Sequence, residues 1–173
     1  HSPTLSFVYL PHLDYPLQRV GPNHESISAE LKAIDDVVGT LVEYYSAQHI
    51  DVCVLSEYAI EPVDDAVAIN RELLKHNLLS IREECGREYL DAGRSSAFAV
   101  PDHQVAHVYV RNQEQIDQVA TILEETDGIE FVYKGDQRGD LAHERCGDIV
   151  VVSDANRWFS HDWWSCSSKA PDY

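Results

Sequence analysis

Residues 5–22 read LSFVYLPHLDYPLQRVGP, and this stretch decides how the first part of the chain is interpreted. The apolar run 5–10 predicts a short buried strand. His12 and Asp14 follow this run at once, and Gly21-Pro22 then opens a helix. In open α/β sheets, ligands and catalytic groups lie just beyond the carboxyl ends of the strands. Asp14 is therefore the first candidate functional residue.

A strand–helix–strand pattern continues from this stretch. Between residues 26 and about 48, apolar residues recur every three or four positions, which predicts a long helix with one apolar face. Residues 51–55, DVCVL, predict a second buried strand that ends shortly before Glu57. A strand, a crossover helix and a second strand form a right-handed unit, which implies a parallel sheet. Asp14 and Glu57 would then lie along the same edge of that sheet.

The middle of the chain has a pattern of shorter elements. A short helix is predicted at 69–76 and another helix at 113–125, with short strands at 78–82, 96–100, 106–110 and 128–133. Residues 148–152, DIVVV, then return as a buried strand. The predicted fold class is α/β, a mostly parallel sheet with flanking helices plus a small inserted α+β subdomain. Residues 1–77 and 136–173 would form part of the α/β core, and residues 78–135 the insertion.

The composition limits the class of partner. A chain of 173 residues is long enough for one domain with a sizeable core. Its net charge of −17 repels nucleic acid backbones and anionic membranes, so neither is expected to bind through broad electrostatic attraction. No apolar run approaches the roughly 20 residues that span a bilayer. A small phosphate ester is still an acceptable substrate, because bound divalent cations reverse the local field at a site.

The four cysteines, Cys53, Cys85, Cys146 and Cys166, show no zinc-finger spacing. Cys53 lies within the predicted strand 51–55, where we expect a small core residue. The simplest interpretation is that these thiols are reduced in a cytoplasmic protein, and paired disulfides in an exported protein are the alternative.

Several carboxylates and histidines could hold metal ions for phosphoryl transfer. Two metal ions about 4 Å apart can stabilise both the attacking and the leaving oxygen in such a reaction. The candidate ligands in the chain are Asp14, His12, Glu57, His103, His107 and His143. His103 and His107 would lie about 13 Å apart on one strand, so a shared metal is not expected. The structural alternatives are a turn carboxylate at Asp14, a hydrogen-bonded strand-end residue at Glu57, and surface or half-buried histidines.

Two segments resemble the metal-binding segments of type I phosphodiesterase/nucleotide pyrophosphatase enzymes, in the alkaline phosphatase superfamily. In that family the metal-binding aspartate is followed four residues later by His, and then by Gly-Pro at seven and eight. Asp14 is followed by Gly21-Pro22 at those offsets, but Gln18 stands in place of the histidine. The family's Ser-Asp-His-Gly segment, which supplies the second metal, corresponds to SEYA at 56–59. The resemblance therefore implies Asp14 and Glu57 as metal ligands, with Gln18 and Tyr58 as departures. His12 could supply the nitrogen that is missing at Gln18, and His103 could reach the site from the inserted subdomain.

The resemblance extends over nearly the whole chain, with further matches in DHQ at 102–104, GDIVVV at 147–152 and KAPDY at 169–173. It implies a partial alkaline-phosphatase-like fold and a metal-dependent hydrolase of phosphate diesters or nucleotide pyrophosphates, using Zn²⁺ or alternatively Mn²⁺. The family's Thr or Ser nucleophile and its last His ligand have no recognisable counterpart here. We therefore expect a C-terminal part of a catalytic domain, inactive alone; a complete processed domain is the alternative.

Two other functions are kept as alternatives. The departures Gln18, Tyr58 and Ala59 favour a non-catalytic relative that keeps the fold and acts as a binding or interaction module. A small α/β domain unrelated to phosphatases is the third interpretation. The aromatic residues between Trp158 and Trp164 could dock onto other parts of the protein or, if exposed, favour homo-oligomers.

Overall fold

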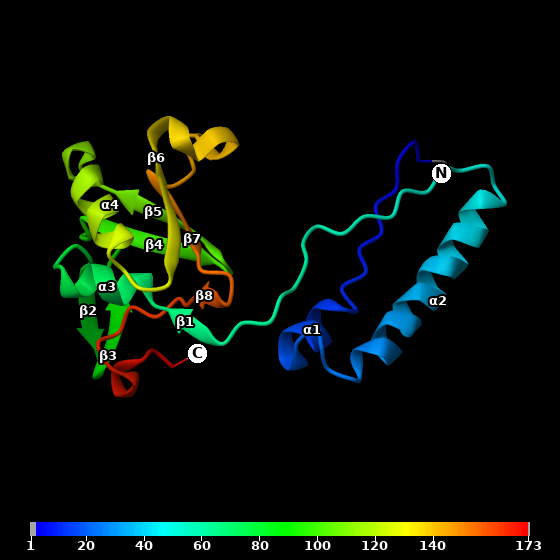
Figure 1. Ribbon diagram of the computed structural model, residues 1–173, viewed down its shortest axis with the longest axis horizontal. Helices are drawn as coiled ribbons and strands as arrows, with labels where there is room; N and C mark the ends of the chain where they lie inside the picture. Colours follow the sequence, from blue (N-terminus) through cyan, green and yellow to red (C-terminus); the bar gives the residue numbers. More distant parts are fainter. Residues whose placement is uncertain (1–2, 173) are drawn as a thin grey trace. The chain divides into compact units, whose positions relative to one another are not determined.

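The computed structural model describes residues 3–172, and the chain divides into two compact units, residues 1–62 and 63–173 (Figure 1). Residues 1, 2 and 173, which the predicted domain limits include, lie outside the described part. None of the helices in the described part has both the length and the apolar character needed to span a bilayer.

The first unit contains two helices, α1 (Asp14–Val20) and α2 (Ile27–Ser46). Helix α2 confirms the helix predicted from the apolar repeat between residues 26 and 48, and Glu30 in its first turn suits the helix dipole. Helix α1 ends at Gly21, whose φ of 78° lies in the region that glycine adopts without a steric penalty. The remaining described residues of this unit are extended or irregular.

The strands predicted at residues 5–10 and 51–55 are not formed in this structure. A strand satisfies its backbone N–H and C=O groups only by pairing with a neighbour, and neither segment pairs within the described residues. Their apolar side chains are exposed, with Phe7 at 91% and Leu55 at 79%. Cys53, predicted to be a core residue, is also exposed. The predicted strand–helix–strand unit is therefore wrong for this structure.

The second unit is built around a four-stranded antiparallel sheet in the order β4-β5-β7-β6. Its strands are β4 (Ala97–Asp102), β5 (Val105–Val110), β6 (Ile129–Lys134) and β7 (Ile149–Ser153). Helices α3 (Ile69–Lys75) and α4 (Ile116–Glu124) pack on this sheet. Alternate residues of β5 are buried, as expected for a sheet with one face against the core. The predicted helices and the strands at 96–100, 106–110 and 128–133 are thus confirmed.

Smaller elements complete this unit. Strands β1 (Asp65–Val67) and β8 (Arg157–Phe159) form a parallel pair, and β2 (Ile81–Glu84) and β3 (Arg87–Leu90) an antiparallel one. Three short 3₁₀ helices are η1 (Gln113–Gln115), η2 (Gly135–Leu141) and η3 (Ser167–Lys169). The protein is thus a mixed α/β fold with parallel and antiparallel sheets, as the fold class predicts, although its largest described sheet is antiparallel and not parallel.

Strand β7 occupies a different place from the one expected. The sequence placed 148–152 in the main sheet, apart from the insertion 78–135. In the structure β7 lies between β5 and β6, with Ile149 opposite both Val108 and Lys134. Four of its five residues are buried, which suits the central strand of a sheet. In this structure the strand therefore belongs with the residues assigned to the insertion.

Candidate functional site

Asp14, Gln18 and Tyr58 form a hydrogen-bonded group, which we name the Asp14 cluster. Asp14 is the first residue of α1, and its Oδ1 accepts a hydrogen bond of 2.8 Å from Gln18 Nε2. The spacing of four residues brings these two side chains to the same face of the helix. Tyr58, 44 residues further along, donates its hydroxyl to the same oxygen at 2.7 Å. All three residues belong to the first unit.

The carboxylate keeps the Tyr58 hydroxyl protonated. The hydrogen bond to Asp14, together with the nearby negative charges of Asp14 and Glu57, raises the pKa of Tyr58 from its ordinary 10.0 to about 12. A hydroxyl that donates to an anion loses that bond when it ionises, so the neutral form is favoured. At neutral pH, Tyr58 is therefore a hydrogen-bond donor and not an anionic oxygen ligand.

His12 has a different partner from Asp14. Its Nε2 lies 2.7 Å from Oε2 of Glu30, a residue in the first turn of α2. The His12 side chain is 45% exposed. The structure therefore joins His12 to α2, and the prediction that His12 supplies a metal ligand in place of Gln18 stays a prediction.

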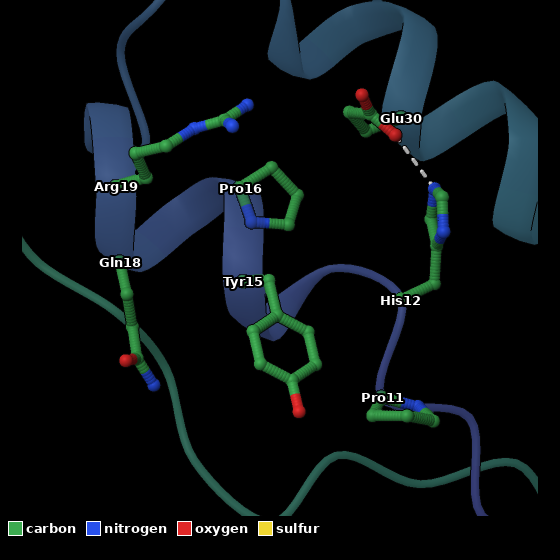
Figure 2. Close-up of a pocket in the computed structure, with 7 residues that line it drawn as sticks. All are labelled: Pro11, His12, Tyr15, Pro16, Gln18, Arg19 and Glu30. Atoms are coloured by element: carbon green, nitrogen blue, oxygen red, sulfur yellow. Dashed lines mark ion pairs between the residues drawn. The ribbon is translucent and has the colours of Figure 1, made fainter.

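An open hollow of about 670 Å³ lies beside these residues in the first unit (Figure 2). It is lined by Pro11, His12, Tyr15, Pro16, Gln18, Arg19 and Glu30. Figure 2 shows Arg19 on one side of the hollow and the His12–Glu30 pair on the other, with Pro16 between them. Arg19 supplies the permanent positive charge of this lining. Arg19 could not be identified from the sequence, because one arginine on a short helix carries no distinctive pattern.

Glu57 is exposed, and within the described residues its side chain takes part in no hydrogen bond or ion pair. The neighbouring turn is held by Ser56, whose hydroxyl donates to the backbone oxygen of Tyr58 at 2.7 Å. Glu57 therefore contributes negative charge near Tyr58 without a hydrogen bond to the Asp14 cluster.

The predicted histidines of the second unit have local structural partners. His103 lies between β4 and β5 with a φ of 56°, and its Nε2 is 3.9 Å from Oδ1 of the exposed Asp102. His107 lies on β5, where its Nδ1 accepts a hydrogen bond of 3.2 Å from the backbone N–H of Gly147. The prediction that His103 supplies a metal ligand stays a prediction.

The segment before β7 is also structural. Nδ1 of His143 accepts from the backbone N–H of Arg145 at 3.1 Å. Asp148 accepts hydrogen bonds from the backbone N–H of Val110 at 2.8 Å and from Gln113 at 3.0 Å. Asp148 thus holds the end of β5.

The Asp14 cluster does not fit a divalent metal ion. Zinc in proteins is bound by imidazole nitrogens, thiolates and carboxylate oxygens, and Mn²⁺ prefers carboxylates. The cluster offers one carboxylate, while its amide and hydroxyl both turn hydrogen atoms toward it. Within residues 3–172, no group of three or more His, Cys, Asp or Glu side chains is placed to hold a metal ion. Within the first unit, the predicted ligands Asp14, His12 and Glu57 form no such group among the described residues, and their binding of a metal ion stays a prediction.

Comparison with known proteins gives the chain a family. No curated protein matches it significantly. A solved structure with a significant match is phosphonoacetate hydrolase from Sinorhizobium meliloti 1021 in complex with phosphonoacetate, with 18% identity and a TM-score of 0.42. The alignment covers 57% of this chain and 24% of the hydrolase, so the match spans only a minor part of that protein's length. The family model described as type I phosphodiesterase / nucleotide pyrophosphatase matches residues 1–172. The chain therefore belongs to the type I phosphodiesterase/nucleotide pyrophosphatase family.

Proposed function

We propose that this chain is part of a hydrolase that cleaves phosphate diesters or nucleotide pyrophosphates. The observation that carries the proposal is the family match over residues 1–172. In phosphoryl transfer the protein mainly positions the reacting groups and stabilises the charge on the phosphate oxygens. The candidate site should therefore supply positive charge and a fixed substrate position, and it needs little covalent chemistry from the side chains described above.

The Arg19 side of the hollow supports a phosphate-ester substrate. A guanidinium group can donate two parallel hydrogen bonds to phosphate oxygens. In a chain of net charge −17, Arg19 gives this hollow a fixed cation, although Glu30 also belongs to the lining. We propose that Arg19 contacts the phosphate oxygens and that Tyr15 and the two prolines contact the less polar part of the substrate.

The proposed reaction depends on a divalent metal ion, as it generally does in this family, with Zn²⁺ expected and Mn²⁺ as the alternative. Such an ion acts as a Lewis acid on the phosphoryl oxygens and activates the nucleophile. Its ligands are not gathered among the described residues. Metal binding by His12, Glu57 or His103 stays a prediction from the sequence.

We further propose that the nucleophile lies outside these 173 residues and that the chain alone is inactive. The resemblance places a Thr or Ser nucleophile where a strand leads into a helix. Thr4 precedes an extended segment and not a helix, so it does not meet this requirement. The fragment would then contribute substrate contacts to a site that other segments complete.

The test is hydrolysis of bis(p-nitrophenyl) phosphate by the full-length protein after chelation of metals and addition of Zn²⁺ or Mn²⁺. We expect metal-dependent turnover, with Arg19→Gln raising KM on the order of tenfold, since one charge-assisted contact is lost. The matched control is Lys32→Gln, which removes an exposed cation of α2 that pairs with Asp36. Absence of turnover with either metal would overturn the proposal and favour a non-catalytic relative. Turnover in the chelated protein would contradict the metal requirement alone.

A further inference from the structure

We infer that the Asp14 cluster is a metal-free site in which the amide of Gln18 and the hydroxyl of Tyr58 occupy the Asp14 carboxylate in place of a divalent cation. This inference concerns what the carboxylate binds. It does not depend on the proposed hydrolase activity, because a hydrolase could hold its metal at other residues.

The geometry shows that one carboxylate oxygen is already occupied. Oδ1 of Asp14 accepts from Gln18 at 2.8 Å and from Tyr58 at 2.7 Å. Both distances lie in the normal range for hydrogen bonds of these types. Hydrogen bonds to an ionised acceptor are roughly twice as strong as bonds between neutral groups. Two such donors fill the two lone-pair directions of Oδ1.

The same two donors oppose a cation at this oxygen. Each of them points the positive end of an N–H or O–H bond at Oδ1. A divalent ion bound there would face these hydrogen atoms, so both side chains would have to turn away and both charge-assisted bonds would be lost. At Oδ1, the charge of Asp14 is therefore compensated by dipoles and not by a metal ion.

The cluster also joins two distant segments of the first unit. Asp14 and Gln18 belong to α1, whereas Tyr58 follows the second extended segment. Ser56 donates to the backbone oxygen of Tyr58 at 2.7 Å, which fixes the turn that contains Glu57. We therefore assign Tyr58 a positioning role: its hydroxyl holds the turn at residues 56–58 against α1.

Isothermal titration of the metal-stripped full-length protein with Zn²⁺ and with Mn²⁺ tests the inference directly. The chain has nine histidines, so its total binding is compared with that of Asp14→Asn. We expect Asp14→Asn to leave the metal stoichiometry and affinity unchanged. Loss of one bound ion in Asp14→Asn would overturn the inference. Neither outcome depends on turnover, so the result is separate from the test of the hydrolase.

A gain-of-binding variant tests the placement of the three residues. Gln18→His combined with Tyr58→His replaces both donors with imidazoles beside Asp14, and we expect one additional Zn²⁺ per chain. Adding Asp14→Asn to this variant should weaken that new site on the order of tenfold or more. A folded double variant without additional Zn²⁺ would overturn the placement. Far-ultraviolet circular dichroism checks that the double variant keeps its helix content, and if the double variant is unfolded, the comparison of the unaltered protein with Asp14→Asn decides.

Discussion

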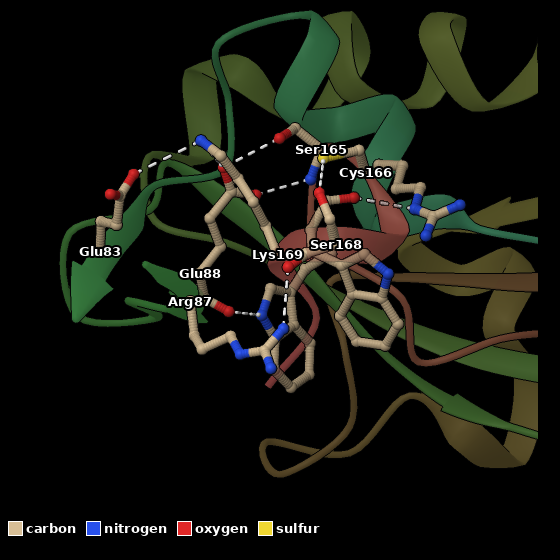
Figure 3. A network of polar contacts seen from close by, with 10 residues as sticks. Glu83, Arg87, Glu88, Ser165, Cys166, Ser168 and Lys169 are labelled. Carbon is tan, nitrogen blue, oxygen red and sulfur yellow. Dashed lines mark hydrogen bonds and ion pairs between the residues drawn. The ribbon is translucent and has the colours of Figure 1, made fainter. Parts of the chain in front are cut away.

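Glu88 accepts two hydrogen bonds from Ser165, one from its backbone N–H at 2.6 Å and one from its hydroxyl at 2.8 Å (Figure 3). The Glu88 side chain is only 3% exposed, and Nζ of Lys169 lies 2.9 Å from its Oε1. The indole of Trp163 donates to the backbone oxygen of Glu88 at 3.0 Å. One buried carboxylate on β3 thus fixes a segment that lies more than seventy residues later in the chain.

Glu88→Gln should destabilise the second unit. The substitution keeps the size of the side chain but removes its charge. It also places an NH₂ group where the carboxylate accepts from Ser165 and Lys169. Loss of satisfied, charge-assisted hydrogen bonds in a buried place typically costs about 1–3 kcal/mol. Chemical denaturation, followed by tryptophan fluorescence, measures the free energy of unfolding. Glu84→Gln is the control, because Glu84 lies on the neighbouring β2 and is exposed. Equal effects of the two substitutions would contradict the role of Glu88.

The same carboxylate should make stability depend on pH. Burial alone would raise the pKa of Glu88, but the hydrogen bonds from Ser165 and Lys169 outweigh it and hold the pKa below the ordinary 4.5. A lowered folded-state pKa contributes stability above pH 4.5, and this contribution is lost as the pH falls through the folded-state value. We expect the free energy of unfolding to fall below pH 4.5 less steeply in Glu88→Gln than in the unaltered protein. If the free energy of unfolding fell with pH equally steeply in both proteins, this prediction would be wrong.

The Tyr58 hydroxyl should ionise at a higher pH than that of an ordinary tyrosine. Its hydrogen bond to Asp14 raises its pKa to about 12. In Asp14→Asn the negative charge is removed, so the pKa should move back toward 10.0. Phenolate absorbance during alkaline titration measures this shift, and Tyr58→Phe identifies the contribution of Tyr58 among nine tyrosines. A difference spectrum with the same midpoint before and after Asp14→Asn would show that Asp14 and Tyr58 are not hydrogen-bonded.

The sequence predicted those elements whose pattern is local. The apolar repeat between 26 and 48 predicted α2, and the short segment 106–110 predicted β5. By contrast, apolar composition predicted strands at 5–10 and 51–55, but a strand also needs a paired neighbour, and no local pattern shows whether one is present. The place of β7 was missed for the same reason: pairing partners lie far away in the sequence.

Of the two hydrogen bonds to Asp14 in the candidate site, only the one from Gln18 could be predicted from the sequence. Gln18 lies four residues after Asp14, so their contact can be read from helix spacing once α1 is assigned. In the sequence, Gln18 and Tyr58 are departures from metal-binding positions of the family, and no pattern predicted that both side chains donate to the carboxylate of Asp14. The contact with Tyr58 spans 44 residues and depends on how the chain folds back. A departure from a family motif can thus be a replacement of one interaction by another.

A buried amide completes the edge of the main antiparallel sheet. β4 is an edge strand, and Asn70 of α3 bonds both backbone groups of its residue Ala99. Nδ2 of Asn70 donates to the carbonyl oxygen of Ala99 at 2.9 Å, while the N–H of Ala99 donates to Oδ1 at 2.8 Å. Asn70 is only 2% exposed, so it takes the place that a neighbouring strand would otherwise fill.

Asn70→Asp should therefore destabilise the protein in a pH-dependent way. A carboxylate can still accept from the N–H of Ala99, but its other oxygen would face the carbonyl oxygen at the former donor distance. Repulsion and burial raise the folded-state pKa of the new carboxyl group, because only its protonated form can donate. A raised folded-state pKa means that stability is recovered at low pH and lost as the pH rises through that value. Thermal unfolding should show the deficit, relative to the unaltered protein, shrinking between pH 7 and about pH 5. A deficit independent of pH would show that the amide does not bridge α3 and β4.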